Sequence, residues 1–292
     1  MNLMSEVCDE KYHTLSTSIP ELKESMVIVL PVYNRREITK KFIARLQMQT
    51  YKDFVLFLFD DGTDGTGELV SKELPEQSRI FKGDGTWFWG GALRYAFKLL
   101  KNQIKNHTIL LTNDDLVFGE DYLEIGSRLV KDNLLVSTTV YEDTKVIDGG
   151  IVIDWKKYKF KVGTPIDCAS TRGLFLTLNT WKKTGNINRF LPMHGDYDFT
   201  CRAMKKGAII KAPSNLIAYL TDKSDQKKVH VFSKFHYMNP FHHTIFLVFH
   251  CPLKYLPLNL ARVWGSAVWK TIRGVKQNDT GKAASGREFN PM

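Results

Sequence analysis

The chain has 292 residues, of which 43% are apolar and 25% carry a charge. These values are ordinary for a globular protein, so a fibrous or largely disordered chain is excluded. Four cysteines lie far apart and form no CxxC pair, which argues against a disulfide framework and a zinc site and favours reduced thiols in a cytosolic setting.

The net charge of +10 is distributed unevenly. Residues 222–292 contain eleven Lys or Arg and four Asp or Glu, so seven of the net positive charges lie in the last quarter. Such a segment indicates either an anionic partner surface or a solvated basic tail. The first fifteen residues lack the basic start and apolar core of a signal peptide, and no run reaches the roughly 18 apolar residues that span a bilayer. We therefore expect an intracellular protein.

After a polar leader at residues 1–25, apolar runs and helical patterns alternate along the chain. Continuous apolar runs at 26–33 and 54–59 are typical of buried parallel strands, and shorter strands are predicted near 79–81 and at 107–112. Between them, helices are predicted around 38–46 and at 92–100. This alternation predicts an α/β fold with an open, mostly parallel sheet that is covered on both faces.

The pattern changes after about residue 135. Residues 146–162 alternate apolar and polar side chains around Gly149-Gly150, like a hairpin or meander, and residues 169–178 predict a strand that contains Arg172 and Gly173. A helix is predicted over residues 196–206, with Gly207 as its stop signal.

Three of the predicted strands end in polar clusters: Tyr33-Asn34-Arg35, Asp60-Asp61 and Asn113-Asp114-Asp115. Ligands of open α/β sheets bind beyond the carboxyl ends of the strands. Clustered carboxylates suit a hard cation such as Mg²⁺ or Mn²⁺, which takes oxygen ligands and shares the phosphate oxygens of a substrate. Local alternatives stay open, because Asp is also a favoured helix cap and Asp-Gly favours a tight turn.

A glycine-rich stretch at residues 83–91 leads into the predicted helix at 92–100. Helix N-termini present free N–H groups to phosphate, and glycines let the backbone come close to a ligand. The stretch does not satisfy GxGxxG, because Phe88 stands at the third glycine position, so a dinucleotide fold is disfavoured. Trp87 and Trp89 are either core anchors or stacking surfaces for a sugar or base.

Two carboxylates, Asp196 and Asp198, begin the predicted helix at 196–206, where the helix dipole stabilises negative charge. Asp196 is a candidate base for an incoming hydroxyl, with helix capping as the alternative. Asp198 is spaced to form an ion pair with Arg202, four residues later.

The C-terminal segment at residues 256–276 shows an apolar stripe with Lys and Arg mainly off it. The stripe consists of Leu260, Val263, Trp264, Ala267, Val268 and Ile272. This pattern predicts a helix that lies on an anionic membrane surface, and packing on its own domain or on a partner subunit is the alternative. Five histidines, at 230, 236, 242, 243 and 250, match no standard zinc spacing.

Five motifs, in this order, resemble the inverting glycosyltransferase family two, whose members share the GT-A (Rossmann-like) fold. They are residues 29–35, 60–63, 87–91, 113–115 and 195–202, and they cover roughly residues 26–220. The Trp-Phe-Trp-Gly-Gly motif is similar to that of rhamnosyl- or related transferases of bacterial polysaccharide synthesis. The resemblance implies a catalytic domain at 26–222, with a nucleotide-binding half at 26–118 and an acceptor-binding half at 119–222. A basic helical extension follows at 223–292.

The resemblance also implies roles for individual residues. Asp61 would bond to the uracil or thymine of the donor, Asp115 would hold Mg²⁺ or Mn²⁺, and Asp196 would be the catalytic base. The other donor-binding positions are Pro31, Tyr33, Asn34, Arg35, Trp87, Gly90, Gly91, Asn113 and Asp114, and we assign Trp89, Arg172 and Asp198 to the acceptor. Two positions depart from the family pattern, because Asn113 replaces the first Asp of DxD and Gly195 replaces the common Glu before the base.

The expected function is metal-dependent, inverting transfer of a sugar from a UDP- or dTDP-sugar to a hydroxyl of a bacterial glycan or lipid-linked glycan. Such a reaction belongs to O-antigen, capsule or other cell-surface polysaccharide synthesis. We expect a peripheral enzyme at the inner face of the cell membrane, with no nucleic-acid partner and with homo-oligomers left open. The alternatives are a nucleotidyltransferase acting on a sugar phosphate and a catalytically degenerate carbohydrate- or membrane-binding scaffold.

Overall fold

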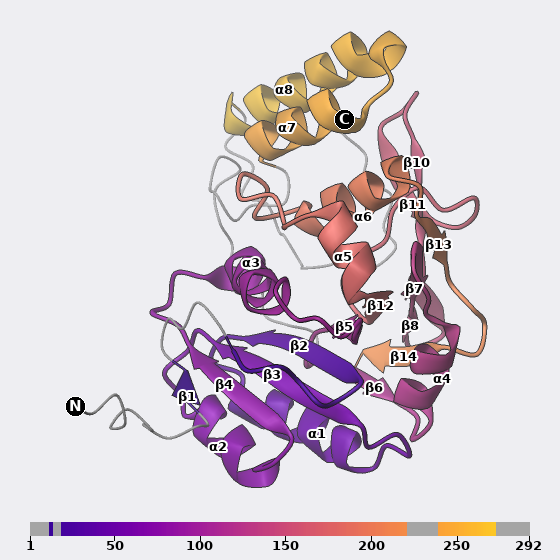
Figure 1. Cartoon of the computed structure of the whole chain (residues 1–292). Helices are drawn as coiled ribbons and strands as arrows, with labels where there is room; N and C mark the ends of the chain where they lie inside the picture. Colours follow the sequence, from indigo (N-terminus) through magenta and orange to yellow (C-terminus); the bar gives the residue numbers. More distant parts are fainter. Residues whose placement is uncertain (1–11, 14–18, 221–238, 273–292) are drawn as a thin grey trace.

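The structure, a computed structural model, describes residues 12–13, 19–220 and 239–272 (Figure 1). Its central sheet has eight strands in the order β1-β4-β3-β2-β5-β12-β7-β13. Within it, β12 runs antiparallel to both of its neighbours, whereas the other neighbouring pairs are parallel. The strands are β1 (Tyr12–His13), β2 (Met26–Val32), β3 (Phe54–Asp60), β4 (Ser78–Lys82), β5 (Thr108–Leu111), β7 (Leu134–Ser137), β12 (Leu174–Thr177) and β13 (Ile209–Lys211). The predicted mostly parallel sheet is confirmed.

Helices cover both faces of this sheet, as the continuous apolar runs predicted (Figure 1). One face packs against α3 (Phe88–Leu100), α5 (Leu178–Thr184) and α6 (Gly195–Lys205), and the other against α1 (Arg36–Gln47), α2 (Thr66–Glu73) and α4 (Tyr122–Leu129). Alternate residues of one strand supply the two cores, because successive side chains of a strand point to opposite faces. In β2, Val27 and Val29 pack toward α3, while Met26 and Ile28 pack toward α1.

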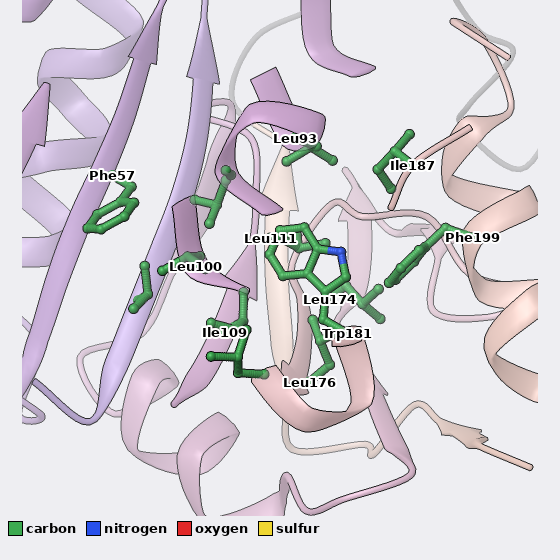
Figure 2. Packing of buried hydrophobic residues seen from close by; sticks show 14 of the residues in the cluster. Phe57, Leu93, Leu100, Ile109, Leu111, Leu174, Leu176, Trp181, Ile187 and Phe199 are labelled. Carbon is green, nitrogen blue, oxygen red and sulfur yellow. The ribbon is translucent and has the colours of Figure 1, made fainter. Parts of the chain in front are cut away.

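The core beneath α5 and α6 is built around a single indole (Figure 2). Trp181 of α5 is fully buried and lies between β12, represented by Leu174 and Leu176, and Phe199 of α6. The Trp181 and Phe199 rings meet edge to face with their centroids 6.3 Å apart. Aromatic side chains dominate core energetics through their large buried area, so this contact fixes α6 on the sheet.

Two smaller β-elements adjoin the central sheet. A four-stranded sheet has the order β6-β14-β8-β9, and β10 pairs with β11 as an antiparallel hairpin. Their bounds are β6 (Leu116–Phe118), β8 (Thr139–Glu142), β9 (Lys145–Asp148), β10 (Ile151–Asp154), β11 (Lys159–Val162) and β14 (Ile217–Leu220). The expected turn at Gly149-Gly150 is therefore a crossing between two sheets, and the hairpin turn lies at residues 155–158.

The strand predicted over residues 169–178 is shorter than expected. It begins only at Leu174, because Gly173 adopts a left-handed backbone with φ +75°. A side chain at Gly173 would place Cβ 2.6 Å from the Thr138 hydroxyl oxygen, so this tight approach also requires glycine. Arg172 consequently lies just outside β12, at the edge of the sheet, rather than within a strand.

Helices α7 (Pro240–His250) and α8 (Leu256–Ile272), joined through the short 3₁₀ helix η1 (Leu253–Tyr255), form a hairpin next to α6 (Figure 1). The stripe predicted to face a membrane is instead partly internal: Val263 and Ala267 are buried, and the Trp264 indole N–H donates to the Thr244 hydroxyl at 3.0 Å. These residues therefore pack within the chain, which was the alternative prediction, although Val268 is 49% exposed.

Within the described ranges, no helix has the length and apolarity needed to cross a bilayer. Several predictions concern residues outside these ranges. They are the predictions for His230 and His236, for the end of the basic segment after residue 272, and for most of the leader.

Two helical glycines make a matched test of core packing. A Cβ added at Gly126 in α4 would lie 2.3 Å from the Phe175 ring, whereas one added at Gly265 in α8 would meet nothing within 4 Å. We expect Gly126→Ala to lower the free energy of unfolding by about 1–3 kcal/mol because the buried ring must move. Gly265→Ala should raise it by up to about 1 kcal/mol through helix propensity. Urea denaturation measures both, and equal effects would contradict the packing.

Candidate active site

Four chain segments meet at one edge of the central sheet. The parallel strands β2, β3 and β5 end there, with Val32 paired to Asp60, and the antiparallel strand β12 begins there. The Gly173 N–H donates to the Leu111 carbonyl at 3.1 Å, which brings the segment around Arg172 beside residues 112–115. The edge is therefore lined by most of the polar clusters that the sequence singled out, as expected for an open α/β sheet.

The end of β2 forms a tight turn against the end of β3. Asn34 has a left-handed backbone with φ +51°, and its side-chain oxygen accepts from the Thr63 N–H at 2.7 Å. A Cβ on Gly62 would stand 2.5 Å from the Asn34 nitrogen, so the two turns fit only with glycine there. Tyr33 is 57% exposed, and Pro31 lies on the last part of β2, partly buried. Both flank the turn at the edge of the sheet.

The two carboxylates that end β3 have different partners. Asp60 is buried and structural, because it accepts from the Lys82 ammonium and from the Gly67 N–H, both at 2.9 Å. Asp61 instead holds the glycine-rich loop: its two oxygens accept from the N–H groups of Gly85 at 2.7 Å and of Phe88 at 3.0 Å. A carboxylate has about four acceptor positions, so Asp61 retains capacity for a further donor.

The two tryptophans of the loop behave differently. Trp87 packs between Phe59 and Tyr95, with centroid distances of 6.2 and 5.1 Å, so it is a core anchor. The Trp89 ring lies close to the backbone at the start of α6, since a Cβ added at Gly195 would lie 3.2 Å from the ring. This close approach explains why glycine, rather than the family's usual Glu, precedes Asp196.

Gly90 and Gly91 lie in the first turn of α3, one turn earlier than the helix start predicted at residue 92. At Gly91 an added Cβ would come within 3.2 Å of Trp87, and at Gly90 it would lie 3.4 Å from the Arg94 guanidinium. The backbone N–H groups of this turn lie at the N-terminus of a thirteen-residue helix, where the dipole favours anions.

The Asn113-Asp114-Asp115 cluster follows the end of β5. Asp114 is buried, paired with Arg35 at 3.0 Å and bonded to the Thr39 hydroxyl at 2.8 Å. Burial raises the pKa of Asp114 despite these partners. The contact between Arg35 and Asp114 joins the start of α1 to the segment after β5. Arg35 Nη2 is buried without a hydrogen-bond partner, so the guanidinium keeps a donor for a ligand oxygen, and the assignment of both residues to the donor stays a prediction.

Asn113 and Asp115 remain as oxygen ligands at this position, with Asn113 partly buried and Asp115 buried. Among the described residues, no three His, Cys, Asp or Glu side chains gather as a complete protein metal site would require. One carboxylate and one amide oxygen still fit Mg²⁺ or Mn²⁺, because such ions are often bound by one or two carboxylates plus substrate phosphates.

Asp196 lies in the first turn of α6, after His194, which is held in a left-handed conformation with φ +68°. The carboxylate is partly buried, and one oxygen accepts from the Tyr197 N–H at 2.8 Å. Burial raises the pKa of Asp196 to about 7; the Tyr197 N–H and the charge of Arg172 oppose this rise, and the charge of Asp148 adds to it. A carboxyl with this pKa can exchange a proton near neutrality.

Arg172 and Asp148 accompany Asp196. Asp148, at the end of β9, is buried and bonded to the Ser170 hydroxyl and to the Gly149 N–H, and burial raises the pKa of its carboxyl. The Nε and Nη1 groups of Arg172 are buried and have no hydrogen-bond partner. Unsatisfied charged donors are costly to bury, which indicates that a ligand oxygen is their partner.

Sequence reasoning missed Asp148. The only available signal was its position before Gly149-Gly150, and a pairing with Asp196, 48 residues later, cannot be read from spacing.

Both carboxylate oxygens of Asp198 are engaged within the protein, and its assignment to the acceptor stays a prediction. One oxygen accepts from Arg202 Nε at 2.8 Å, and the other contacts His250 Nε2 of α7 at 2.9 Å. Burial alone would raise the pKa of Asp198, but the His250 hydrogen bond and the Arg202 charge hold it below its usual value. Arg202 also donates to the carbonyls of Thr184 and Asn186, both at 2.9 Å. Asp198 thus fastens α6 to its surroundings.

A second histidine contact joins α6 and α7 on the other side of Asp196. His194 Nε2 lies 3.3 Å from His243 Nε2, and His243 Nδ1 lies 2.8 Å from the Tyr158 hydroxyl of the hairpin. His243 and His250 are seven residues apart, so they share one face of α7. Together they contact the residues two positions before and two positions after Asp196.

The chain is similar to known glycosyltransferases. The family model described as "Glycosyl transferase family 2" matches residues 27–211. A Rickettsia felis protein described as an "uncharacterized glycosyltransferase" is 32% identical over 120 residues, which is 39% of this chain. The match spans about a fifth of that relative, 19% of its length.

Solved structures show the same fold at low identity. The mannosyltransferase PcManGT from Pyrobaculum calidifontis, in complex with GDP-Man and Mn²⁺, superposes with a TM-score of 0.58 at 13% identity, over 91% of this chain and 76% of that one. A fragment of S. aureus TarS, in complex with UDP-GlcNAc, gives a TM-score of 0.56 at 14% identity, over 87% and 74% of the two chains. The fold is GT-A, and with the family match over most of its length, the chain belongs to glycosyl transferase family 2.

Proposed function

We propose that the protein is an inverting glycosyltransferase that moves a sugar from a UDP- or dTDP-sugar to a hydroxyl of a bacterial glycan or lipid-linked glycan. The observation that carries this proposal is Asp196, a partly buried carboxyl with a pKa of about 7 at the start of α6. It directly follows Gly195, whose backbone comes close to the Trp89 ring of the glycine-rich segment. A general base works best when its pKa lies near the operating pH. Asp196 therefore supplies the proton acceptor that an attacking hydroxyl needs.

In the proposed step, the Asp196 carboxylate takes the proton of the acceptor hydroxyl while that oxygen forms a bond to the anomeric carbon. The bond between the anomeric carbon and the diphosphate oxygen breaks on the opposite face, and its electron pair leaves with the nucleoside diphosphate. A single displacement of this kind inverts the anomeric configuration. Buried Arg172, whose Nε and Nη1 have no partner, donates to an oxygen of the acceptor sugar beside Asp196.

The donor occupies the edge formed by β2, β3 and β5. The turn at Tyr33-Asn34 and the carboxylate of Asp61 receive the base, and the first turn of α3 faces the diphosphate. Asp115, assisted by the amide oxygen of Asn113, would hold Mg²⁺ or Mn²⁺. When bound, the ion would neutralise charge that develops on the departing diphosphate.

The acceptor proposal rests on location as well as chemistry. Trp89 and Arg172 lie on the Asp196 side of the edge, where an aromatic face and a charged donor suit a sugar. We place the reaction in the synthesis of a cell-surface polysaccharide, at the cytoplasmic face of the membrane.

Replacement of the base gives the first test. Asp196→Asn keeps the shape of the side chain but removes its proton affinity, so we expect the transfer rate to fall by about 10²- to 10⁴-fold. Binding of UDP or dTDP, measured by calorimetry with and without Mn²⁺, should change little. Asp143→Asn, at an exposed turn position with φ +53°, is the matched control. Transfer by Asp196→Asn at the native rate would refute the assignment.

The pH dependence of kcat/KM gives the second test. Since the base acts when ionised, kcat/KM should rise with pH and level off above a midpoint near 7. Arg172→Gln removes a positive charge that lowers the pKa of Asp196, so the midpoint should move to higher pH, whereas Arg172→Lys should leave it nearly in place. Asp148→Asn removes a negative charge and should move the midpoint to lower pH. Shifts of the opposite sign would contradict the proposed site.

A further inference from the structure

An apolar surface lies at the elbow between α7 and α8, outside the proposed active site. Its members are Val248 and Phe249 at the end of α7, Leu253 in η1, and Leu258 in the first turns of α8. Their exposed fractions are 59%, 60%, 84% and 49%. Four large apolar side chains within eleven residues form a concentration that isolated surface leucines do not. We call this surface the α7–α8 elbow.

The opposite face of α7 is fully used inside the protein. Phe246 and Leu247 are buried in a cluster with Tyr158 and Phe160 of the β10–β11 hairpin, and His243 and His250 contact α6. The elbow side chains therefore point away from the domain, so packing within the described residues does not account for them. The hairpin forms a layer at one end of the molecule, next to α6 (Figure 1).

The charges around the elbow favour one kind of partner. Residues 239–272 contain three Lys or Arg and no Asp or Glu. Lys254 is exposed beside Leu253, Lys205 of α6 reaches the Phe249 carbonyl at 2.5 Å, and Arg262 donates to a carbonyl of the hairpin turn that carries the exposed Lys156 and Lys157. An apolar tip with a basic surround matches a bilayer surface, where acyl chains lie beneath anionic headgroups.

We propose that the α7–α8 elbow inserts into the interfacial region of a phospholipid bilayer that contains anionic lipid. The binding residues are those of the elbow rather than the α8 stripe that the sequence favoured, which is partly internal. Because α7 contacts α6 through His243 and His250, the bound bilayer would lie on the Asp196 side of the molecule. A lipid-linked acceptor would then reach the site from that surface, a consequence that rests on the proposed function.

Co-sedimentation of the full chain with vesicles tests the proposal. Vesicles of phosphatidylcholine alone are compared with vesicles that also contain phosphatidylglycerol, at low and high salt and without any sugar substrate. We expect binding to the anionic vesicles that weakens with salt. The double variant Phe249→Ser with Leu253→Ser should lower the partition coefficient by about tenfold or more, because two large side chains no longer enter the lipid.

The matched control replaces two exposed apolar residues elsewhere, Ile104→Ser with Ile209→Ser, whose exposed fractions are 90% and 59%. This variant should bind vesicles like the native chain. Equal losses in both double variants, or no vesicle binding by the native chain, would overturn the proposal. Sedimentation velocity distinguishes a second copy as occupant: a native dimer that the elbow variant alone converts to monomer, without vesicle binding, also overturns it. Donor hydrolysis, assayed separately, reports on the proposed function independently of these outcomes.

Discussion

The arrangement of the site depends on one buried carboxylate, Asp198, with both oxygens committed. Its contacts to Arg202 and His250 join α6 to the loop after α5 and to α7. Loss of one partner would leave a buried charge uncompensated, which is costly, so the contacts hold α6 in one orientation. Asp196 lies two residues earlier on the same helix, so its backbone position is fixed by the same contacts. The C-terminal hairpin thus supports the helix that carries the proposed base, since His243 and His250 contact residues on either side of Asp196.

The same packing makes Asp196 unfavourable to the folded state. Burial raises its pKa from the ordinary 3.8 to about 7, so the folded protein holds this proton more tightly than the unfolded chain. The stability cost of ionisation begins as pH rises above 3.8, grows until about 7, and stays constant above that. A carboxylate that weakens the fold at working pH is typical of a functional site. The same region contains the buried carboxyl of Asp148 and two donors of Arg172 that have no partner. These groups lower local stability and are suited to bind a ligand.

The sequence predicted the sheet and the edge of the site because both leave local patterns. Continuous apolar runs identified β2 and β3, and polar residues at their ends marked the ligand-binding edge. Contacts across long separations left no such pattern. Asp198 and Arg202 had the spacing of a surface pair, but His250 turned them into a buried network that only the fold reveals. Similarly, the α8 stripe has the same periodicity whether it faces lipid or α7. Arg172 was expected inside a strand, and the backbone at Gly173 placed it at the edge instead.

The central claim is that the fold holds Asp196 as a carboxyl that titrates near neutrality. NMR of the protein labelled with ¹³C at the aspartate side-chain carboxyls measures this directly, without substrate. A resonance that titrates with a midpoint near pH 7 in the native chain, and that is missing from the spectrum of Asp196→Asn, is the result the account predicts. An Asp196 resonance that titrates near its ordinary value of 3.8 would contradict it, because the site would then hold an ordinary solvated carboxylate rather than a desolvated base.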